Sequence, residues 1–431
     1  MGQFTVAIAG LGARGLNTYA PFAKLYPEKM RITAVADVMP ERVERARREY
    51  GLPASMCFDS AEKLLSQPKL ADVMIIATQD RQHYDMTMRA MRLGYDILLE
   101  KPISPDLGEC LRLRDAAGAL GRKVMVCHVL RYTKFYEVLK QIIDGGSLGK
   151  IVNIFAVENV GYWHMAHSFV RGNWRSSLLT SPMILQKCCH DFDIFTWLTG
   201  KNCISVSSMG GLSYFKPENA PLGSAAYCSA AGACRKECPY DAYKIYMEHP
   251  HIGYYGAKNR GWPVSVLEAD PTPETLGAAL DASPYGRCVF RCDNDVVDHQ
   301  IVNMLYEDGV AVSFTMTGFT NDNSRGINIM FEKGEVSGCT NTQIIEVQPF
   351  GGEKRTIDIA ELTDDLSGHG GGDNEMLRQL FERMDSSPSA EDRSSIEKSV
   401  HSHIIAFAAE TSRLAGGGLI NIEEFEREFK K

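Results

Sequence analysis

The sequence lacks apolar runs long enough for a membrane span, and it lacks strongly charged segments. No stretch of the 431 residues approaches the roughly 20 uninterrupted apolar positions that a membrane-spanning helix needs. The 46 basic and 54 acidic residues give a net charge of −8, and no polybasic run or basic helix face stands out. Nucleic acid and anionic membranes are therefore disfavoured as partners.

Cysteine is too sparse for a disulfide scaffold, and the first residues lack the features of a secretion signal. Twelve cysteines in a chain of this length indicate reduced thiols or metal ligands. The opening MGQFTVAIAG has no basic region and no small-residue cleavage site. We expect a soluble cytoplasmic protein. At about 150 residues per domain, the length predicts two or three domains.

The first part of the chain alternates short apolar runs with helical stretches. This pattern is typical of βαβ units, and it predicts a doubly wound α/β domain with a parallel sheet covered on both faces. The predicted strands cover residues 4–9, 32–36, 73–77, 97–99 and 124–127. We place this domain at residues 1–128.

After Tyr132 the pattern changes to longer extended runs. Predicted strands at 151–160, 204–209, 296–306 and 310–317 indicate a second, α+β domain on a mostly antiparallel sheet, which we place at residues 129–431. A helix is expected near each end of this domain, at 135–143 and 393–414. A segment from about 215 to 284, rich in Pro, Gly, Tyr and Cys, is too long for an ordinary connection. It is either a lid or a stapled insertion.

A glycine-rich sequence follows the first predicted strand and opens a helix. It reads Gly10-Leu11-Gly12-Ala13-Arg14-Gly15, and this context predicts a dinucleotide-binding Rossmann domain. Gly10 would make the turn, Gly12 would let the backbone approach the pyrophosphate, and Gly15 would allow the helix to pack on the strand. The helix N-terminus would supply free amides to the phosphates. The alternative is a glycine turn without a ligand.

Asp37 stands at the end of the second predicted strand, 22 residues after Gly15. A carboxylate at this place accepts hydrogen bonds from the ribose hydroxyls of the adenosine and repels a 2′-phosphate. The sequence therefore favours NAD over NADP. Arg42, Arg45 and Arg47 lie nearby and weaken this preference.

Glu100-Lys101-Pro102 follows the strand at 97–99, at the carboxyl edge where doubly wound folds bind ligands. The alternative for Lys101 is an ordinary surface lysine. Together with the glycine loop, Thr78-Gln79-Asp80 and His83, this arrangement resembles the Gfo/Idh/MocA family of NAD(P)-dependent oxidoreductases over nearly the whole chain. The resemblance implies a Rossmann domain followed by a domain with a large open-faced sheet, and a homodimer or homotetramer.

The resemblance also implies roles for individual residues. Lys101 would lie between nicotinamide and substrate, and the segment Lys187-Cys188-Cys189-His190-Asp191 is similar to the helix that carries the family's catalytic histidine, which makes His190 the candidate base. The expected cofactor contacts include Thr78, Gln79, His83, Glu100 and Lys101. Many members have an aspartate four residues before the histidine, where this chain has Gln186, so His190 would be oriented by Asp191 or Asp193.

Helical spacing places Lys187, His190 and Asp191 on one helix face, although Lys187 and Asp191 could form a simple ion pair instead. Aromatic rings with hydrogen-bonding neighbours suit a sugar ring, and they suit a protein core equally. The expected substrate contacts are Arg131, Trp163, His164, Arg171, Trp174, Lys187 and Asp191. His369 could likewise contact the substrate or support the protein core. His401 and His403 on the last helix are expected to be structural.

Cysteines gather in the long segment with the spacing C-x5-C-x3-C at Cys228, Cys234 and Cys238, and C-x3-C at Cys288 and Cys292. Three or four thiolates, drawn from Cys228, Cys234, Cys238 and Cys292, could clamp this segment around a structural zinc ion. The spacing is looser than that of familiar zinc modules, and unligated reduced cysteines are the alternative.

The sequence thus predicts an NAD(P)-dependent oxidoreductase that transfers a hydride between nicotinamide and a ring carbon of a sugar, sugar derivative or cyclitol. Two alternatives stay open. One is a redox-neutral cleavage of a glycoside by transient oxidation and elimination. The other is a regulator that senses the nucleotide without catalysis.

Overall fold

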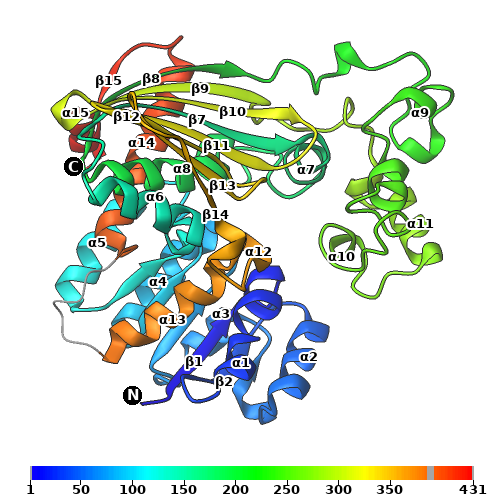
Figure 1. Cartoon of the computed structure of the whole chain (residues 1–431). Helices are drawn as coiled ribbons and strands as arrows, with labels where there is room; N and C mark the ends of the chain where they lie inside the picture. Colours follow the sequence, from blue (N-terminus) through cyan, green and yellow to red (C-terminus); the bar gives the residue numbers. More distant parts are fainter. Residues whose placement is uncertain (1, 386–392, 430–431) are drawn as a thin grey trace.

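Two sheets organise the chain, one after the other along the sequence (Figure 1). The computed structural model describes residues 2–385 and 393–429. The first sheet is wholly parallel and the second is mixed and mostly antiparallel, which confirms the fold class expected from the sequence.

The first sheet has six strands in the order β3-β2-β1-β4-β5-β6. Their bounds are β1 Phe4–Ala9, β2 Met30–Ala36, β3 Cys57–Phe58, β4 Val73–Ile76, β5 Asp96–Leu99 and β6 Val124–Val126. The residues of β4 are all fully buried, as expected for a parallel strand covered on both faces. The strands reverse their order between β1 and β4, and this switch point is where doubly wound folds bind ligands.

Helices connect these strands. They are α1 Phe22–Leu25, α2 Pro40–Tyr50, α3 Ala61–Leu65, α4 His83–Arg92 and α5 Leu107–Leu120, with the π-helix η1 Ala13–Tyr19 and the short 3-10 helices η2 Ala54–Met56 and η3 Asp80–Gln82. The C-terminal part of the chain adds one more helix to this domain. Met376 and Phe381 of α13 (Gly372–Asp385) share a core with Val6 and Ile8 of β1. The first domain is therefore completed by a segment far from it in sequence.

The second sheet has nine strands in the order β14-β13-β12-β11-β7-β10-β9-β8-β15. Their bounds are β7 Ile151–Gly161, β8 Cys203–Gly211, β9 His299–Tyr306, β10 Ala311–Thr320, β11 Ser324–Phe331, β12 Gly334–Cys339, β13 Ile344–Pro349, β14 Arg355–Asp358 and β15 Ile420–Asn421. Burial alternates along β9, so this strand has one face in the core and one face in solvent.

The remaining helices cover the inner face of the second sheet and join it to the first domain. They are α6 Lys134–Asp144, α7 Tyr162–His164, η5 Met165–Arg171, α8 Met183–Thr199, α12 Ser367–Gly370, α14 Ile396–Leu414 and α15 Ile422–Phe429, with the turns η4 Val129–Tyr132, η10 Glu307–Gly309 and η11 Ile359–Glu361. Helix α14 contacts α5 of the first domain as well as α8 and β8 of the second. It therefore fixes how the two sheets face one another.

The long segment rich in Pro, Gly, Tyr and Cys lies between β8 and β9. We call residues 212–298 the insertion lobe. It contains short helices at η6 Pro217–Asn219, η7 Cys228–Ala230, α9 Cys234–Glu237, η8 Lys244–Glu248, α10 Val264–Leu267, α11 Pro273–Ala282 and η9 Pro284–Gly286. In Figure 1 it stands apart from the sheets, beside α7, and η9 contacts η5. The lobe includes the predicted insertion segment at about 215–284 and extends beyond it at both ends.

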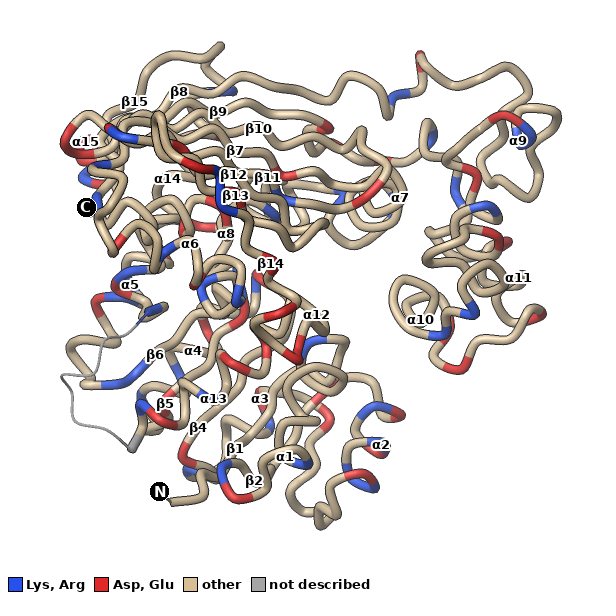
Figure 2. The backbone as a smooth tube through the Cα atoms, viewed as in Figure 1, with Lys and Arg blue, Asp and Glu red and all other residues tan. Residues whose placement is uncertain are grey.

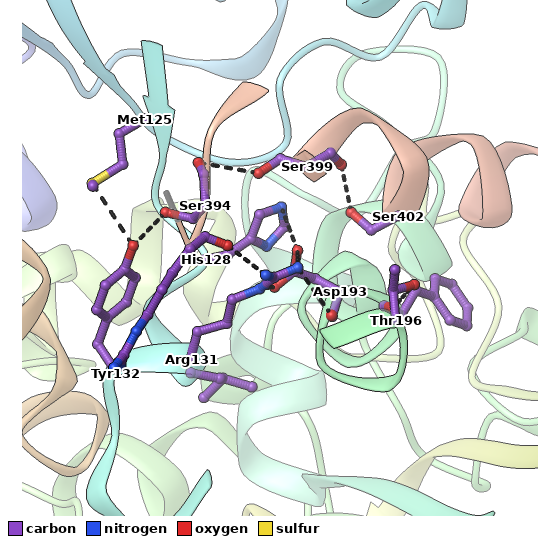
Figure 3. A network of polar contacts seen from close by, with 12 residues as sticks. Met125, His128, Arg131, Tyr132, Asp193, Thr196, Ser394, Ser399 and Ser402 are labelled. Atoms are coloured by element: carbon purple, nitrogen blue, oxygen red, sulfur yellow. Dashed lines mark hydrogen bonds and ion pairs between the residues drawn. The ribbon is translucent and has the colours of Figure 1, made fainter. Parts of the chain in front are cut away.

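A buried ion pair lies at the junction of the two domains (Figure 3). Arg131 of η4 contacts Asp193 of α8 through two hydrogen bonds, Nε to Oδ2 at 2.5 Å and Nη2 to Oδ1 at 2.7 Å. Arg131 also donates to the carbonyl of Arg393, next to α14. Both side chains are almost completely buried. The guanidinium of Arg131 thus links the segment after β6 to α8 and to the residues just before α14.

Basic and acidic residues are interspersed along the backbone (Figure 2). Helix α2 carries both signs, and Arg47 pairs with Glu44 while Arg45 pairs with Glu49. Within the described part of the chain, no helix has the length and apolarity that crossing a membrane requires.

Breaking the junction pair should destabilise the protein strongly. Arg131→Met leaves the carboxylate of Asp193 buried without its cation, and we expect a loss of about 3–5 kcal/mol in the free energy of unfolding. Urea denaturation at pH 7 measures it. Arg427→Met removes one member of an exposed ion pair with Glu423, and its expected cost is under about 1 kcal/mol. Equal losses in the two variants would show that Arg131 does not hold the junction.

Four buried histidines should make the fold sensitive to acid. Burial lowers the pKa of His167 and His403 to about 3, and it lowers the pKa of His128 and His190 well below 6.5. Below pH 6.5 the unfolded chain binds protons that the folded chain refuses, so stability falls as the pH falls. We expect a loss of about 2 kcal/mol per histidine between pH 7.5 and 5.

Urea denaturation at the two pH values measures this loss. His403→Gln should reduce the pH dependence by about 2 kcal/mol, whatever its effect on stability at pH 7.5. His251→Gln changes an exposed histidine and serves as the matched control. A pH dependence that is the same in both variants would contradict the assignment.

Candidate active site

The glycine loop between β1 and η1 has the shape that a dinucleotide requires. Gly10 has φ +92°, and a Cβ there would lie 2.5 Å from the carbonyl oxygen of Ala77. A Cβ on Gly15 would lie 1.9 Å from the carbonyl oxygen of Gly10. Both positions therefore demand glycine. At Gly12 the nearest atom to an added Cβ is Arg42 Nη1, 3.8 Å away, so the backbone is open on the side where a pyrophosphate would pass.

Asp37 follows β2 directly and its carboxylate lies against the glycine loop. Its Oδ2 accepts a hydrogen bond from the Leu11 amide at 2.6 Å, and its Oδ1 accepts one from the Met39 amide at 2.8 Å. Arg42 Nη1 lies 3.7 Å from Oδ2 and is half exposed. The residues present thus fit a dinucleotide, with the carboxylate and a neighbouring cation both at the ribose end.

Arg14 of the loop turns towards Glu100 instead of outwards. Its Nε donates to Glu100 Oε1 at 2.5 Å, and its Nη2 lies 2.6 Å from Asp373 Oδ1 on α13. Tyr19 donates its hydroxyl to the same carboxylate of Glu100. The guanidinium and the tyrosine hydroxyl hold the pKa of Glu100 below its ordinary value despite burial. This network fastens the glycine loop to the turn that carries Lys101.

Two histidines support that turn from opposite sides. His83 lies with Nδ1 2.8 Å from the carbonyl of Pro102 and Nε2 3.2 Å from the carbonyl of Thr78. His403 of α14 accepts a hydrogen bond at Nε2 from the Ile103 amide, at 2.9 Å. The sequence predicts that His83 contacts the cofactor. In the structure, each of its two ring nitrogens lies within hydrogen-bonding distance of a backbone carbonyl.

Lys101 points from this turn to helix α8 of the second domain. Its Nζ donates to the carbonyl of Gln186 at 2.9 Å, and burial lowers its pKa. The side chain of Gln186 faces elsewhere: its Oε1 lies 3.0 Å from the hydroxyl of Ser181, which is also 3.0 Å from Asp80 Oδ2. Gln186 thus contacts Lys101 through its backbone carbonyl, and its side chain shares the hydroxyl of Ser181 with Asp80 of the Rossmann domain.

His190 lies one helical turn beyond Gln186. It is 6% exposed, and its Nδ1 is buried without a hydrogen-bond partner among the described residues. Burial lowers its pKa most, followed by the positive charge of Lys101. The imidazole is therefore neutral near pH 7 and able to accept a proton. The ring of His128 lies edge-on to it, with 5.6 Å between the centroids.

The two carboxylates expected to orient His190 are bound elsewhere. Asp193 pairs with Arg131, and Asp191 accepts a hydrogen bond from Arg325 Nε of β11 at 2.9 Å. Burial raises the pKa of Asp191, and Arg325 opposes this rise. Neither carboxylate is hydrogen-bonded to the imidazole in the described structure, so the sequence argument for this role is not supported.

A four-membered ion network forms the wall next to His190. Glu158 of β7 is buried, with Oε1 3.3 Å from Lys187 Nζ and Oε2 2.8 Å from Arg325 Nε. Arg325 also binds Asp191. Lys187 therefore pairs with Glu158, and Asp191 pairs with Arg325, in place of the simple pair that helix spacing suggested. The sequence analysis missed Glu158 and Arg325, which lie on different strands and are far apart along the chain.

The other expected substrate residues divide into two groups. His164 of α7 lies with Nδ1 2.8 Å from Asn323 Oδ1, and Asn323 lies two residues before Arg325 of the ion network, which places His164 next to this region. Trp163 is buried beside it. Arg131, Arg171 and Trp174 have their contacts within the fold, and for Arg131 this contact is the junction pair described above.

Arg171 and Trp174 are tied to the interior of the second domain. The guanidinium of Arg171 is completely buried and donates to the carbonyls of Arg287 and Tyr240 in the insertion lobe. Trp174 packs against Phe169, with 6.0 Å between ring centroids. A buried arginine that binds backbone carbonyls anchors the lobe to η5. The contacts of both side chains thus lie within the fold, and a substrate role for either stays a prediction.

The expected zinc site is not formed in the structure. Cys228 lies 3.8 Å from Arg171 Nη2, and Cys292 donates to the carbonyl of Cys288. Cys234 is directed at the carbonyl of Gly223, and burial raises the pKa of Cys238. Across residues 2–385 and 393–429, no three His, Cys, Asp or Glu side chains converge as a metal-binding group. None of the twelve cysteines forms a disulfide.

Comparison with known proteins relates this arrangement to an oxidoreductase family. The chain matches the NAD-binding Rossmann-fold domain of the Gfo/Idh/MocA oxidoreductases over residues 4–128, and the C-terminal alpha/beta domain of the same family over residues 140–402. It is 24% identical to the YteT protein of Bacillus subtilis over 400 residues, which cover 87% of this chain and 88% of that protein.

Two further similarities concern proteins whose ligands or activities are named. An inositol 2-dehydrogenase of Gluconacetobacter diazotrophicus is 27% identical over 177 residues, 41% of this chain and 49% of that protein. The fold is similar to that of an oxidoreductase from Agrobacterium radiobacter, solved with NAD+, L-tartaric acid and magnesium. That similarity has a TM-score of 0.68 at 13% identity, covering 98% of this chain and 99% of that chain.

The two family domains follow one another along the sequence and correspond to the two sheets described above. The glycine loop, the Lys101 turn and the helix of His190 all lie within the matched residues. The chain therefore belongs to the Gfo/Idh/MocA family of oxidoreductases, with an NAD-binding Rossmann domain and the family's C-terminal alpha/beta domain.

Proposed function

We propose that the protein catalyses NAD(P)-dependent hydride transfer at a ring carbon of a sugar, sugar derivative or cyclitol. One observation carries this proposal. Lys101 of the Rossmann domain reaches the backbone of the helix that holds His190, at the carboxyl edge of the parallel sheet. A cation and a neutral imidazole from two domains thus come together where a nicotinamide ring is expected to lie.

The two side chains have complementary roles. The neutral imidazole of His190 accepts the proton of the substrate hydroxyl, and the ammonium group of Lys101 stabilises the negative charge that develops on that oxygen. When bound, the cofactor supplies the acceptor for the hydride that leaves the same carbon. In the reverse direction the imidazolium returns the proton to the oxygen. Lys101 is suited to this role because its ammonium group donates its hydrogen bond to the backbone carbonyl of Gln186. A neutral partner leaves the positive charge available to the developing alkoxide.

The substrate class rests on the region around these residues and on the named relatives. His164, Lys187 and the Glu158–Arg325–Asp191 network offer several hydrogen-bonding groups beside His190, as a polyhydroxylated ring requires. Inositol dehydrogenases occur among the relatives. The carboxylate of Asp37 beside the glycine loop favours NAD over NADP.

The first experiment is a spectrophotometric survey. Purified protein with NAD or NADP is mixed with cyclitols, aldoses and glycosides, and absorbance is followed in the band of reduced nicotinamide. Growth of that band with one class supports a dehydrogenase and identifies its substrates. A flat trace, with nucleotide recovered from the denatured protein, would overturn the proposal in favour of redox-neutral glycoside cleavage, which chromogenic glycosides without added cofactor then test.

Lys101→Met should separate catalysis from cofactor binding. Loss of a preorganised charge is expected to lower turnover by two or more orders of magnitude, while the affinity for the nucleotide, measured by fluorescence titration, stays largely unchanged. Lys123→Met is the matched control, because Lys123 also lies in the Rossmann domain, partly buried, and donates to a backbone carbonyl, that of Arg383. Unchanged turnover in Lys101→Met would remove Lys101 from the mechanism.

We also propose that the protein pairs with a second copy of itself through the outer face of the large sheet. Helices α8 and α14 cover one face. The strand registers place Phe155, Met209, Ile301 and Leu305 together on the opposite face, and each of them is more than 40% exposed. An apolar face of this kind is typical of an isologous interface.

A charge on this face should separate the copies. Phe155→Asp introduces a carboxylate into the apolar face, and the molar mass measured by light scattering is expected to fall by half or more at micromolar concentration. Leu178→Asp changes a leucine that is 80% exposed on a loop outside this face and should leave the mass unchanged. A wild-type protein that is already monomeric would contradict the proposal directly.

A further inference from the structure

The insertion lobe brings an exposed tryptophan next to the candidate active site. The chain has four tryptophans; Trp163 is buried, Trp174 and Trp197 are partly buried, and Trp262 of the lobe is 40% exposed. The sequence analysis predicts substrate contacts for Trp163 and Trp174 and makes no prediction for Trp262. It lies in the loop before α10, far along the chain from every other site residue.

Trp262 packs against α7 and η5 through three rings. Its centroid lies 5.0 Å from that of His164 in an edge-on arrangement, 5.3 Å from that of His167 and 5.5 Å from that of Trp163. These contacts occupy part of the indole, and the remaining 40% is open to solvent. The aromatic surface that begins at His164 therefore continues outwards onto the lobe.

The loop that carries Trp262 is held in place by its own hydrogen bonds. The side-chain amide of Asn259 donates to the carbonyl of Ile252 at 2.8 Å and to that of Trp262 at 3.0 Å. Asn259 Oδ1 accepts a hydrogen bond from the Gly261 amide at 2.8 Å. An indole with a fixed backbone loses little conformational freedom when a ligand packs on it, so Trp262 is suited to binding.

His164 connects this surface to the chemistry. Its Nδ1 lies 2.8 Å from Asn323 Oδ1, and Asn323 lies two residues before Arg325, which binds Asp191 next to His190. The order of contacts outwards from His190 is thus Asp191 and Arg325, then Asn323 and His164, then Trp262. Along this series of contacts, the indole lies beyond His164 as seen from His190.

We propose that Trp262 is a platform for a second sugar ring, so that the substrate is a glycoside of at least two rings and not a free monosaccharide or cyclitol. The CH-rich face of a pyranose packs favourably on an exposed indole, and a ring linked to the one being oxidised would extend in the direction of the lobe. This inference rests on the proposed oxidation at Lys101 and His190, and it narrows the substrate class of that site.

The test compares substrates of one and two rings in the NAD-loaded enzyme. For the hexose configuration that gives the fastest reaction in the survey, the methyl glycoside and a disaccharide with the same oxidised ring are assayed with wild type and Trp262→Ala. We expect the KM of the disaccharide to rise about tenfold in the variant, with the KM of the methyl glycoside and kcat for both changed less than about twofold. Trp262→Phe keeps a ring and should give an intermediate KM.

Tyr255→Ala is the matched control for loss of an exposed aromatic residue. Tyr255 lies on the same lobe, is 57% exposed and packs against Tyr254, and its removal should not affect either substrate. Equal changes for one-ring and two-ring substrates in Trp262→Ala, or no change for either, would overturn the platform. The melting temperature of each variant shows whether the lobe is intact.

A direct binding measurement separates this inference from the proposed function. Disaccharide binding to the NAD-loaded enzyme is followed by calorimetry, without turnover. If no substrate gives a redox signal but Trp262→Ala still weakens disaccharide binding about tenfold relative to Tyr255→Ala, the platform stands and the oxidation does not. If oxidation of monosaccharides is fast and disaccharides do not bind to wild type, the oxidation stands and the platform is wrong.

Discussion

The hydrogen bond from Lys101 Nζ to the carbonyl of Gln186 is the contact on which the candidate site depends. It joins a turn of the Rossmann domain to the helix of the second domain that carries His190. A lysine could reach many partners from such a turn, and its position is defined because the turn itself is held by His83 on one side and His403 on the other. The ammonium group is therefore placed by residues from three distant parts of the sequence.

The charged side chains around the site pair with carboxylates, whereas the ammonium group of Lys101 is held by a backbone carbonyl. Lys187 and Arg325 face Glu158 and Asp191, so two cations meet two carboxylates. Arg14 is committed to Glu100 and Asp373. Lys101, in contrast, is held by a neutral carbonyl. A substrate hydroxyl that begins to lose its proton would find there a charge without a carboxylate bound to it, which is the condition under which a cation stabilises an alkoxide most effectively.

Much of the fold could be predicted from the sequence, because local patterns define it. The five predicted strands of the first sheet match β1, β2, β4, β5 and β6 within two residues, and the glycine loop lies where its motif indicated. Strands β11 to β14 were missed. Their segments contain Gly326, Gly334 and Gly338, which weaken a strand, and pairing with β7 and with one another stabilises them as strands.

The sequence predicts only those site residues that belong to a recognisable motif. Lys101 and His190 come from motifs and lie together, whereas Glu158, Arg325, His403 and Trp262 enter through the fold: two from strands, one from the last helix and one from an insertion. Arg131 and Arg171 show the opposite error, because a sequence does not reveal which arginines will be buried against Asp193 or against backbone carbonyls. Such fold-dependent contacts are where proteins that share a fold can differ in substrate. The insertion lobe, which carries an exposed indole beside His164, is the part of this chain best placed to do so.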